Sequence, residues 1–467
     1  MDDTIRRVFW RRAGLAAGAA VLVIGGAAAG NLFGDQPSTA AGYPTWDSDL
    51  INIENVSETG AGVYVAVLDT GLVPHWRDYF PAARVATQLG TGFVQPASFK
   101  AKGDACGLGI TVGRLSETTW VGSTGSTHGT HVASTILGYS YRSNSDAAAG
   151  FPLPPIMVRG IAPDVTLIPV RVLADYQIPA LPKCGPGYPA QTAVFGTSEM
   201  IAAGIDYVTD LALAGYRPMV INMSLGGSWL DPVEQAAIDR AIANGVIVVA
   251  SAGNEGEWGM GYPGAYAPVI SAGSVGWTGE WLYPGDGPRY RMWWLQYPDL
   301  PLSPGSGDTT DPTALGEVYV SDFSSRAITL AGQELDVLAP GSWVRGPFPG
   351  YPGFNHLPWW SRGLGDLLGR NGGNFYYVGG TSMSAPHVTS VAALMIEKNP
   401  SLTQAQVESI LKSTALAIPA ADSRSVFDFS AWATIGWDTS CDPYGGIACD
   451  AVGAGLMQAD AALAATP

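Results

Sequence analysis

The chain contains 467 residues, of which 47% are hydrophobic and only 14% charged, so it can bury a large core and is not globally disordered. Its formal net charge is −16, and no block of like charges occurs along it. Because binding to phosphate backbones relies on clustered Lys and Arg, this charge balance excludes nucleic acid as a partner.

The first 29 residues have the pattern of an export signal. Arginines at positions 6, 7, 11 and 12 precede an uncharged stretch over residues 13–31, and residues 27–29 are the small alanines that a signal peptidase needs. The stretch is also long enough to span a bilayer, so residues 1–29 are predicted to be a signal peptide or a signal anchor. The Arg6-Arg7 pair leaves the general secretory and twin-arginine routes both open. We expect an exported protein, secreted or tethered to the outer face of the cytoplasmic membrane. It touches the membrane only if this segment is retained.

From Gly62 onward, short apolar runs alternate with helical segments. This alternation predicts an α/β fold of three layers, with a mainly parallel central sheet and helices on both faces. The expected strands are near-continuous apolar runs, as in buried parallel sheets: 63–68, 165–172, 219–223, 246–250 and 269–273. The expected helices are 197–214, 231–243, 382–398, 403–415 and 457–464. Asp231 and Glu234 predict the N-terminal cap of the second helix, and Asn244-Gly245 its end.

Four segments interrupt this alternation. Residues 80–122 and 174–196 are rich in Gly and Pro, and residues 276–320 and 342–375 are crowded with Trp, Tyr, Pro and Gly. We expect long irregular surface loops there. The chain has four cysteines, which fit an oxidising compartment and allow three pairings. Among them, Cys441 with Cys449 closes a short loop, and Cys106 with Cys184 joins two of the Gly/Pro-rich segments.

Three motifs carry residues suited to acyl-transfer chemistry. An apolar strand ends at Asp69-Thr70-Gly71, and ligand sites form beyond the carboxyl ends of parallel strands. His128 and His131 lie at the start of an apolar helical run, where an imidazole can serve as general base for a hydroxyl. Their spacing also suggests a metal, but Gly129 replaces the Glu of a zinc helix and no third ligand follows. Ser382 follows two glycines at the expected start of a helix, where it serves as nucleophile or as an ordinary cap.

A fourth motif supplies a polar amide. The apolar run 246–250 leads into Asn254, whose side-chain N–H can donate to a developing oxyanion.

Together these motifs, in the order Asp, His, Ser, resemble the subtilisin family of serine peptidases. The resemblance implies an Asp-His-Ser triad of Asp69, His128 and Ser382, with Asn254 and the Ser382 backbone N–H in the oxyanion hole. It implies a structural role for His131. Further similar segments run from Gly160-Ile161-Ala162-Pro163 to Gly453-Ala454-Gly455-Leu456. One catalytic domain with insertions is therefore expected over residues 60–465.

The resemblance also implies where the substrate binds. Ser224, Leu225 and Gly226 match the edge that pairs with the peptide backbone like an added strand. Gly261 matches the floor of the P1 pocket, where a glycine leaves depth for a large apolar or aromatic side chain. The implied partners are protein or peptide substrates, and we expect a monomer.

The chain also departs from the family's pattern. Residues 30–59 form only a short N-terminal extension, in place of the folding-assisting propeptide that secreted members carry. Catalysis requires no cofactor, and structural calcium is an option with no assigned ligand.

Two other functions are weighed against this one. Asp69-Thr70-Gly71 also heads the catalytic loop of aspartic peptidases, although the second candidate, Asp438-Thr439-Ser440, lacks the glycine. The other is a non-catalytic binding protein on the same scaffold, with the Trp-rich insertions as its working surface.

Overall fold

The computed structural model describes residues 39–42, 44–103, 106–122, 126–141, 156–185, 187–277, 282–283, 287–288, 318–342, 344–348, 375–418, 423–428, 433–438 and 448–467. The predicted export segment 1–29, Cys441 and large parts of 276–320 and 342–375 lie outside these residues. Among the described helices, none combines the length and apolar character needed to span a bilayer.

A mainly parallel sheet forms the centre of the molecule, as predicted. In spatial order its strands are β16 (Val318–Val320), β13 (Ile270–Trp277), β12 (Ile247–Ser251), β11 (Met219–Met223), β1 (Tyr64–Asp69), β8 (Thr166–Arg171), β2 (Thr91–Val94) and β5 (Ser116–Thr118). β18 (Val337–Pro340) pairs with β13 outside this path. Only the outer pairs β13–β16 and β2–β5 are antiparallel. All five predicted strands are therefore present.

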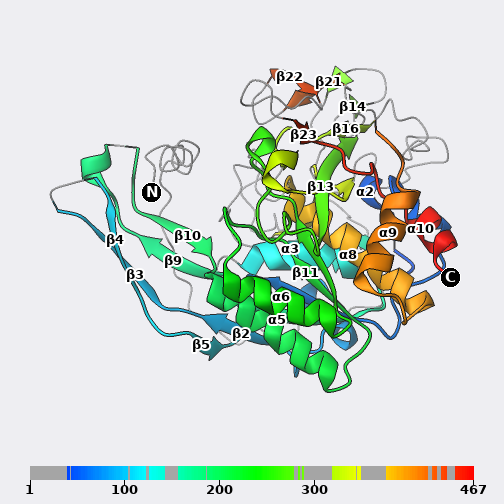
Figure 1. Ribbon diagram of the computed structural model, residues 1–467, viewed down its shortest axis with the longest axis horizontal. Coiled ribbons are helices and arrows are strands. Elements are labelled where there is room, and N and C mark those ends of the chain that lie inside the picture. The colour runs from blue at the N-terminus through cyan, green and yellow to red at the C-terminus, as the bar shows by residue number, and fades with distance from the viewer. Residues whose placement is uncertain are drawn as a thin grey trace, which may run out of the picture.

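The sheet separates two hydrophobic cores because successive side chains of a strand point to opposite faces. In β1, Val65 and Val67 enter one core, and Ala66 and Leu68 enter the other. The first core packs against α3 (Ser126–Leu137) and α8 (Thr381–Lys398), and the second against α5 (Ser198–Leu213) and α6 (Pro232–Ala243). Figure 1 shows α5 and α6 side by side, with α3 and α8 grouped separately. The three-layer prediction is confirmed.

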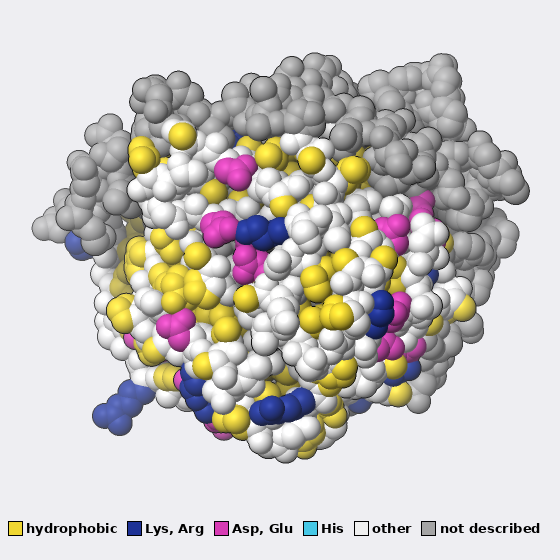
Figure 2. All heavy atoms as spheres, turned by 45° about the vertical axis from the view of Figure 1, so that its right-hand side comes forward, with side chains coloured by type: hydrophobic (Ala, Val, Ile, Leu, Met, Phe, Trp, Pro, Cys, Tyr) yellow, Lys and Arg dark blue, Asp and Glu magenta, His cyan; other side chains and the backbone are white. Residues whose placement is uncertain are grey.

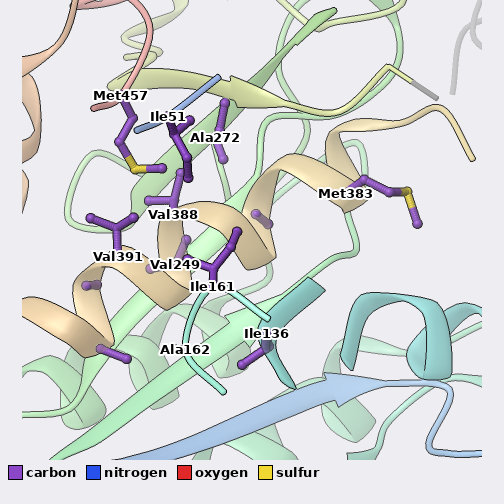
Figure 3. Packing of buried hydrophobic residues seen from close by; sticks show 14 of the residues in the cluster. Ile51, Ile136, Ile161, Ala162, Val249, Ala272, Met383, Val388, Val391 and Met457 are labelled. Atoms are coloured by element: carbon purple, nitrogen blue, oxygen red, sulfur yellow. The ribbon is translucent and has the colours of Figure 1, made fainter. Parts of the chain in front are cut away.

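Helix α8 lies in the middle of the larger core. Figure 3 shows residues from distant parts of the chain, including Ile51, Ile161 and Met457, gathered around Val388 and Val391 of this helix. α9 (Gln404–Thr414) and α10 (Ala459–Ala465) complete this side. At this depth α8 cannot shift without repacking the core.

Helix α6 is capped at Asp231 and ends before Asn244, as the sequence predicted. The Asp231 carboxylate accepts from the Val233 N–H, and Gly245 follows the helix with a positive φ of 78°. Glu234, however, does not complete a capping box, because its side chain is buried against the start of α5, where it meets the Ser198 hydroxyl.

The residues before the predicted catalytic domain pack into its core. α2 (Trp46–Asp49) and the following η1 (Ile53–Asn55) bury Trp46, Leu50 and Ile53 almost completely. Asp47 lies against α8, where its Oδ2 is 3.1 Å from Nε2 of His387. This segment is therefore part of the folded body.

The segments expected to be irregular contain ordered hairpins, so that prediction was wrong for 80–122 and 174–196. β3 (Ala97–Ala101) pairs with β4 (Leu108–Val112), and β9 (Ala174–Ile178) pairs with β10 (Gln191–Phe195). Figure 1 shows the two hairpins leaving the body together as an arm, on the left. Phe99 of β3 packs against Tyr176 and Phe195, and contacts of this range are invisible to local composition.

A disulfide joins the loops at the far ends of the two hairpins. It links Cys106 with Cys184 and settles which of the three pairings forms. Cys449 is also disulfide-bonded.

Further antiparallel strand pairs lie outside the central sheet. They include β6 (Gly138–Tyr141) with β7 (Ile156–Arg159), β19 (Val344–Pro347) with β20 (Phe375–Val378), and β21 (Ser423–Asp428) with β22 (Ala433–Asp438). On the face drawn in Figure 2, charged side chains are few and scattered among uncharged and hydrophobic ones.

Candidate active site

Asp69 and His128 form a partly buried pair at the carboxyl edge of the sheet. Asp69 is the last residue of β1 and is fully buried, while His128 lies in the first turn of α3. Nδ1 of His128 is 2.8 Å from Oδ1 and 3.0 Å from Oδ2 of Asp69. A carboxylate can only accept, so Nδ1 carries the proton and Nε2 of the neutral ring is left with a free lone pair.

The environment of His128 sets its basicity. Burial by itself would lower the pKa of His128, but the negative charge of Asp69 and the hydrogen bond to it outweigh burial and raise this pKa above its usual value. The imidazole is thus a stronger base than a free histidine, which suits proton abstraction from a hydroxyl.

Gly129, next to His128, allows this close approach. A Cβ atom there would lie 2.4 Å from the carbonyl oxygen of Gly71 and 3.1 Å from Oδ1 of Asp69. Glycine, in place of the Glu of a zinc helix, is what lets α3 pack onto the end of β1.

His131 faces away from the pair and has a structural position. It is fully buried, its Nε2 is 3.1 Å from the Val344 carbonyl oxygen, and its ring packs edge-on against Phe348. The two histidines therefore do not converge on a metal.

Both oxygens of the Asp69 carboxylate contact the histidine, and Oδ1 also accepts from the Thr70 N–H. A carboxylate engaged in this way is not arranged to share a proton with a second aspartate. The geometry gives no support to an aspartic peptidase.

Ser382 lies at the start of the buried helix α8. The helix begins at Thr381 after Gly380, so Ser382 is its second residue and its hydroxyl is not the helix cap. Its backbone N–H belongs to the first turn and has no partner four residues back in the helix. The Ser382 hydroxyl donates to the Ser224 carbonyl oxygen at 3.3 Å.

The register of the sheet brings these groups together. Val67 pairs with Asn222, so in the parallel ladder of β1 and β11 Asp69 adjoins Ser224, the first residue beyond β11. Ser224 contacts Ser382 in turn. The sheet register thus puts the Asp69–His128 pair and the Ser224–Ser382 pair at the same edge, although among the described residues no hydrogen bond joins His128 to Ser382.

Asn254 lies beyond the next strand, β12, with an exposed side chain. Its Oδ1 accepts from the Thr381 N–H at 2.8 Å and lies 3.0 Å from Oγ1 of Thr381. An N–H can only donate, so this contact fixes which end of the amide is oxygen. None of the described residues accepts a hydrogen bond from Nδ2 of Asn254, and Thr381, which holds the amide oxygen, directly precedes Ser382.

The predicted substrate edge is tied to the segment that carries Gly261. Gly227 and Tyr262 exchange two backbone hydrogen bonds, each 2.8 Å long. Gly226 and Gly261 face each other across this connection, because a Cβ atom on Gly261 would lie 3.8 Å from Cα of Gly226. Any larger residue at position 261 would narrow the space between the two segments.

Two residues of this site have roles that were not predicted from the sequence. The side chain of Thr381 is fully buried and bonds Gly253 and Asn254, and the side chain of Ser224 bonds Ser382. Thr381 directly precedes the candidate nucleophile, and Ser224 was predicted only to pair with substrate through its backbone. In both cases the signal in the sequence was a hydroxyl side chain at or next to a predicted site residue.

One acidic cluster among the described residues has the spacing of a cation site. It consists of Glu334, Asp336 and Glu408. Lys412 lies among them, with its Nζ bonded to Glu334 and 3.0 Å from Oδ1 of Asp336. The ammonium group already supplies the positive charge, so the donor set does not fit a bound calcium ion.

Comparisons with known proteins identify the family of the chain. The family described as "Peptidase_S8: Subtilase family" matches residues 60–429. Subtilisin DY of Bacillus licheniformis is 27% identical over 378 residues, which are 80% of this chain and 90% of that protein. Subtilisin E of Bacillus subtilis is 29% identical over 295 residues, 62% of this chain, and the match spans only 51% of that protein's length.

Solved structures show the same fold. The structure of fervidolysin from Fervidobacterium pennivorans is 24% identical with a TM-score of 0.50, and the match covers 91% of this chain and 46% of that one. A structure titled "S41 Psychrophilic Protease" also has a TM-score of 0.50, at 21% identity, covering 90% and 99% of the two chains. From the family match over most of its length and the fold it shares with these proteases, the chain belongs to the subtilase family and is a subtilisin-like serine peptidase.

Proposed function

We propose that this protein is an exported endopeptidase that hydrolyses peptide bonds of proteins with Ser382 as nucleophile, His128 as general base and Asp69 as the residue that orients the imidazole. The observation that carries the proposal is the contact of buried Asp69 with Nδ1 of His128, which leaves Nε2 as the basic nitrogen. That arrangement is the defining feature of Ser-His-Asp hydrolases.

In the acylation step, the Ser382 hydroxyl leaves the Ser224 carbonyl and gives its proton to Nε2 of His128 while Oγ attacks the scissile carbonyl carbon. The resulting imidazolium is stabilised by Asp69 and then protonates the leaving amine as the C–N bond breaks. In deacylation, His128 takes a proton from water while the water oxygen attacks the acyl carbon. The imidazolium then returns that proton to Oγ of Ser382 as the ester bond breaks, which releases the carboxylic acid product and restores the free enzyme.

The oxyanion of each tetrahedral intermediate would be held by Nδ2 of Asn254 and by the backbone N–H of Ser382. Support for this assignment is that Thr381 occupies the oxygen of the Asn254 amide and leaves its nitrogen free. Donors held in place before the reaction stabilise developing charge without reorganising.

The substrate backbone would pair with residues 224–226, and its P1 side chain would enter beside Gly261. The opposed glycines at 226 and 261 contribute no side chains there, which supports a large apolar or aromatic P1 residue. Ranking peptide substrates by P1 residue tests this, since we expect Phe and Leu to be preferred. A preference for Asp or Arg would contradict it.

The remaining features complete the proposal. Residues 60–465 form one catalytic domain, working as a monomer on protein or peptide substrates. The Cys106–Cys184 disulfide supports an oxidising location outside the cytoplasm. The chemistry above requires no cofactor, and structural calcium is an option for which we assign no ligand.

The direct kinetic test is a Ser382→Ala variant assayed on a protein substrate and on a short peptide. Turnover should fall by several orders of magnitude, because the nucleophile is gone. Ser384→Ala is the matched control, since Ser384 is a buried serine on the same helix whose hydroxyl bonds the Ala339 carbonyl. If Ser382→Ala retained full biological activity, the protein would instead be a binding protein on this scaffold.

A further inference from the structure

Helix α8 contains a proline one turn after the nucleophile. Pro386 lies inside the helix and has no N–H, so the usual hydrogen bond from residue 386 to the carbonyl oxygen of Ser382 cannot form. A buried carbonyl oxygen left without a donor is strongly unfavourable, so it requires a replacement.

The replacement comes from the substrate edge. Oγ of Ser224 donates to the Ser382 carbonyl oxygen at 2.7 Å, and Ser224 itself is almost fully buried. In the opposite direction, the Ser382 hydroxyl donates to the Ser224 carbonyl oxygen. The two residues therefore hold each other reciprocally, each through one side chain and one backbone carbonyl.

A chain of buried hydrogen bonds fixes the direction of this contact. The Ser382 carbonyl can only accept, so Ser224 must donate to it and must accept from Nδ2 of Asn222, 3.0 Å away. Oδ1 of Asn222 then accepts from the Thr389 hydroxyl at 2.9 Å. Asn222 and Thr389 are both fully buried.

This chain joins β11 to α8 at two points on one face of the helix, because Ser382 and Thr389 are seven residues apart. From this arrangement we infer that the side chain of Ser224 is a positioning residue for the nucleophile: its hydroxyl replaces the helical donor that Pro386 removes and sets the orientation of the Ser382 backbone. The inference rests on the proposed role of Ser382, and it assigns the Ser224 side chain a task separate from the backbone pairing with substrate.

The structure offers closely matched controls. Ser251 is equally buried, lies at the end of the neighbouring strand β12, and donates to the Leu225 carbonyl of the same edge at 3.1 Å. Its hydrogen bond is to Leu225 and not to Ser382. Ser384 is a second control, because it is a buried serine on α8 whose hydroxyl bonds the Ala339 carbonyl oxygen.

The test measures kcat and KM on a short peptide, the rate of acylation by a fluorophosphonate, and thermal stability for Ser224→Ala, Ser251→Ala and Ser384→Ala. We expect Ser224→Ala to lower kcat and the acylation rate about 10- to 100-fold with KM nearly unchanged, the scale expected when a reacting group is misplaced. The two control variants should lose comparable stability and keep their acylation rates. Equal rate losses in Ser224→Ala and Ser251→Ala would overturn the inference.

A double-mutant comparison tests the role of the proline. Pro386→Ala restores an N–H that can reach the Ser382 carbonyl, so Ser224→Ala should lower kcat less than about threefold in that background. An equal loss in both backgrounds would contradict the inference. If Pro386→Ala does not fold, the comparison of Ser224→Ala with Ser251→Ala decides alone. Labelling of the wild type separates the two proposals: no label on Ser382 refutes the proposed function, whereas normal labelling with an unchanged Ser224→Ala rate refutes only this inference.

Discussion

Thr381 holds Asn254 by its amide oxygen, through a backbone hydrogen bond of 2.8 Å from the Thr381 N–H to Oδ1. The Thr381 hydroxyl is in turn fixed by both backbone groups of Gly253, at 3.1 Å each. The residue before the nucleophile thus orients the amide that would bind the oxyanion. Such a donor needs no reorganisation during the reaction, which is why its loss should appear in kcat.

Asn254→Ala should lower kcat about 10²- to 10³-fold, the range known for loss of the oxyanion asparagine in subtilisin itself, with little change in KM. Steady-state kinetics on a short peptide measures both kcat and KM. Asn254→Asp, which has the same shape but carries no N–H donor, should be at least as impaired. A variant affected mainly in KM would show that Asn254 binds substrate instead.

The raised pKa of His128 predicts the acid limb of the pH–rate profile. Only the neutral imidazole accepts a proton, so kcat/KM should rise with pH through the pKa of His128, with a midpoint above its usual value of about 6.5. Protonation of His128 is favoured in the folded state, so its contribution to stability is present below about pH 6.5 and is lost as pH rises through the higher folded pKa.

Asp69→Asn removes the charge that raises this pKa, so the acid limb should move to lower pH. Turnover should also fall, by roughly the 10⁴-fold seen for the same change in other Ser-His-Asp enzymes. An unchanged midpoint in this variant would show that another group controls the acid limb.

The raised pKa of Glu234 predicts that the free energy of unfolding falls as pH rises toward neutrality. Burial, with a smaller contribution from the charge of Asp231 and some opposition from the Ser198 hydroxyl, raises the pKa of Glu234 to about 7. The folded state therefore binds a proton that the unfolded chain releases near pH 4.3, and the free energy of unfolding falls between these two values.

Glu234→Gln keeps the shape and cannot ionise, so it should be more stable than the wild type above pH 7, by at most about 4 kcal/mol. Urea unfolding at pH 5 and pH 8 measures the difference. Glu199→Gln, an exposed change in the first turn of α5, should leave the pH dependence as it is. If Glu234→Gln and wild type have the same dependence, Glu234 is ionised in the folded protein.

The contact of Asp47 with His387 predicts that the N-terminal segment stabilises the catalytic helix. Burial opposes ionisation, but the hydrogen bond and charge of His387 outweigh it and lower the pKa of Asp47. Asp47→Ala leaves a buried imidazole without its partner and should lower the free energy of unfolding by about 3–5 kcal/mol at neutral pH.

Because the pKa of Asp47 is lowered, this contribution should persist above pH 4 and disappear as pH falls through the folded pKa. Glu54→Ala, an exposed change in the same segment, is the control and should stay within about 0.5 kcal/mol of wild type. If Asp47→Ala lowers the free energy of unfolding only slightly, the N-terminal segment is stabilised mainly by the packing of Trp46 and Ile53.

Local patterns were enough to predict the sheet and the acid–base pair. The run 219–223 is β11 to the residue, because an apolar strand buried on both faces has an unambiguous pattern. Asp69 and His128 were recognisable because each stands at the end or start of a clear element, and the structure brings them into contact.

Contacts between distant residues could not be predicted in the same way. Cys106 and Cys184 are 78 residues apart, and the hairpins they join were expected to be irregular because their segments are rich in Gly and Pro. The Ser224 side chain reaches Ser382 only after β11 and α8 have packed together. Asp47 reaches His387 across most of the chain, which no local pattern encodes.

The most direct test of the central claim is labelling of the exported protein with a fluorophosphonate probe, followed by mass spectrometry of the modified peptide. We predict that the label is found on Ser382, and that Ser382→Ala takes up none while Ser384→Ala is labelled like the wild type. No label on Ser382 in the folded protein, or equal labelling of Ser382→Ala, would contradict the assignment of Ser382 as the nucleophile.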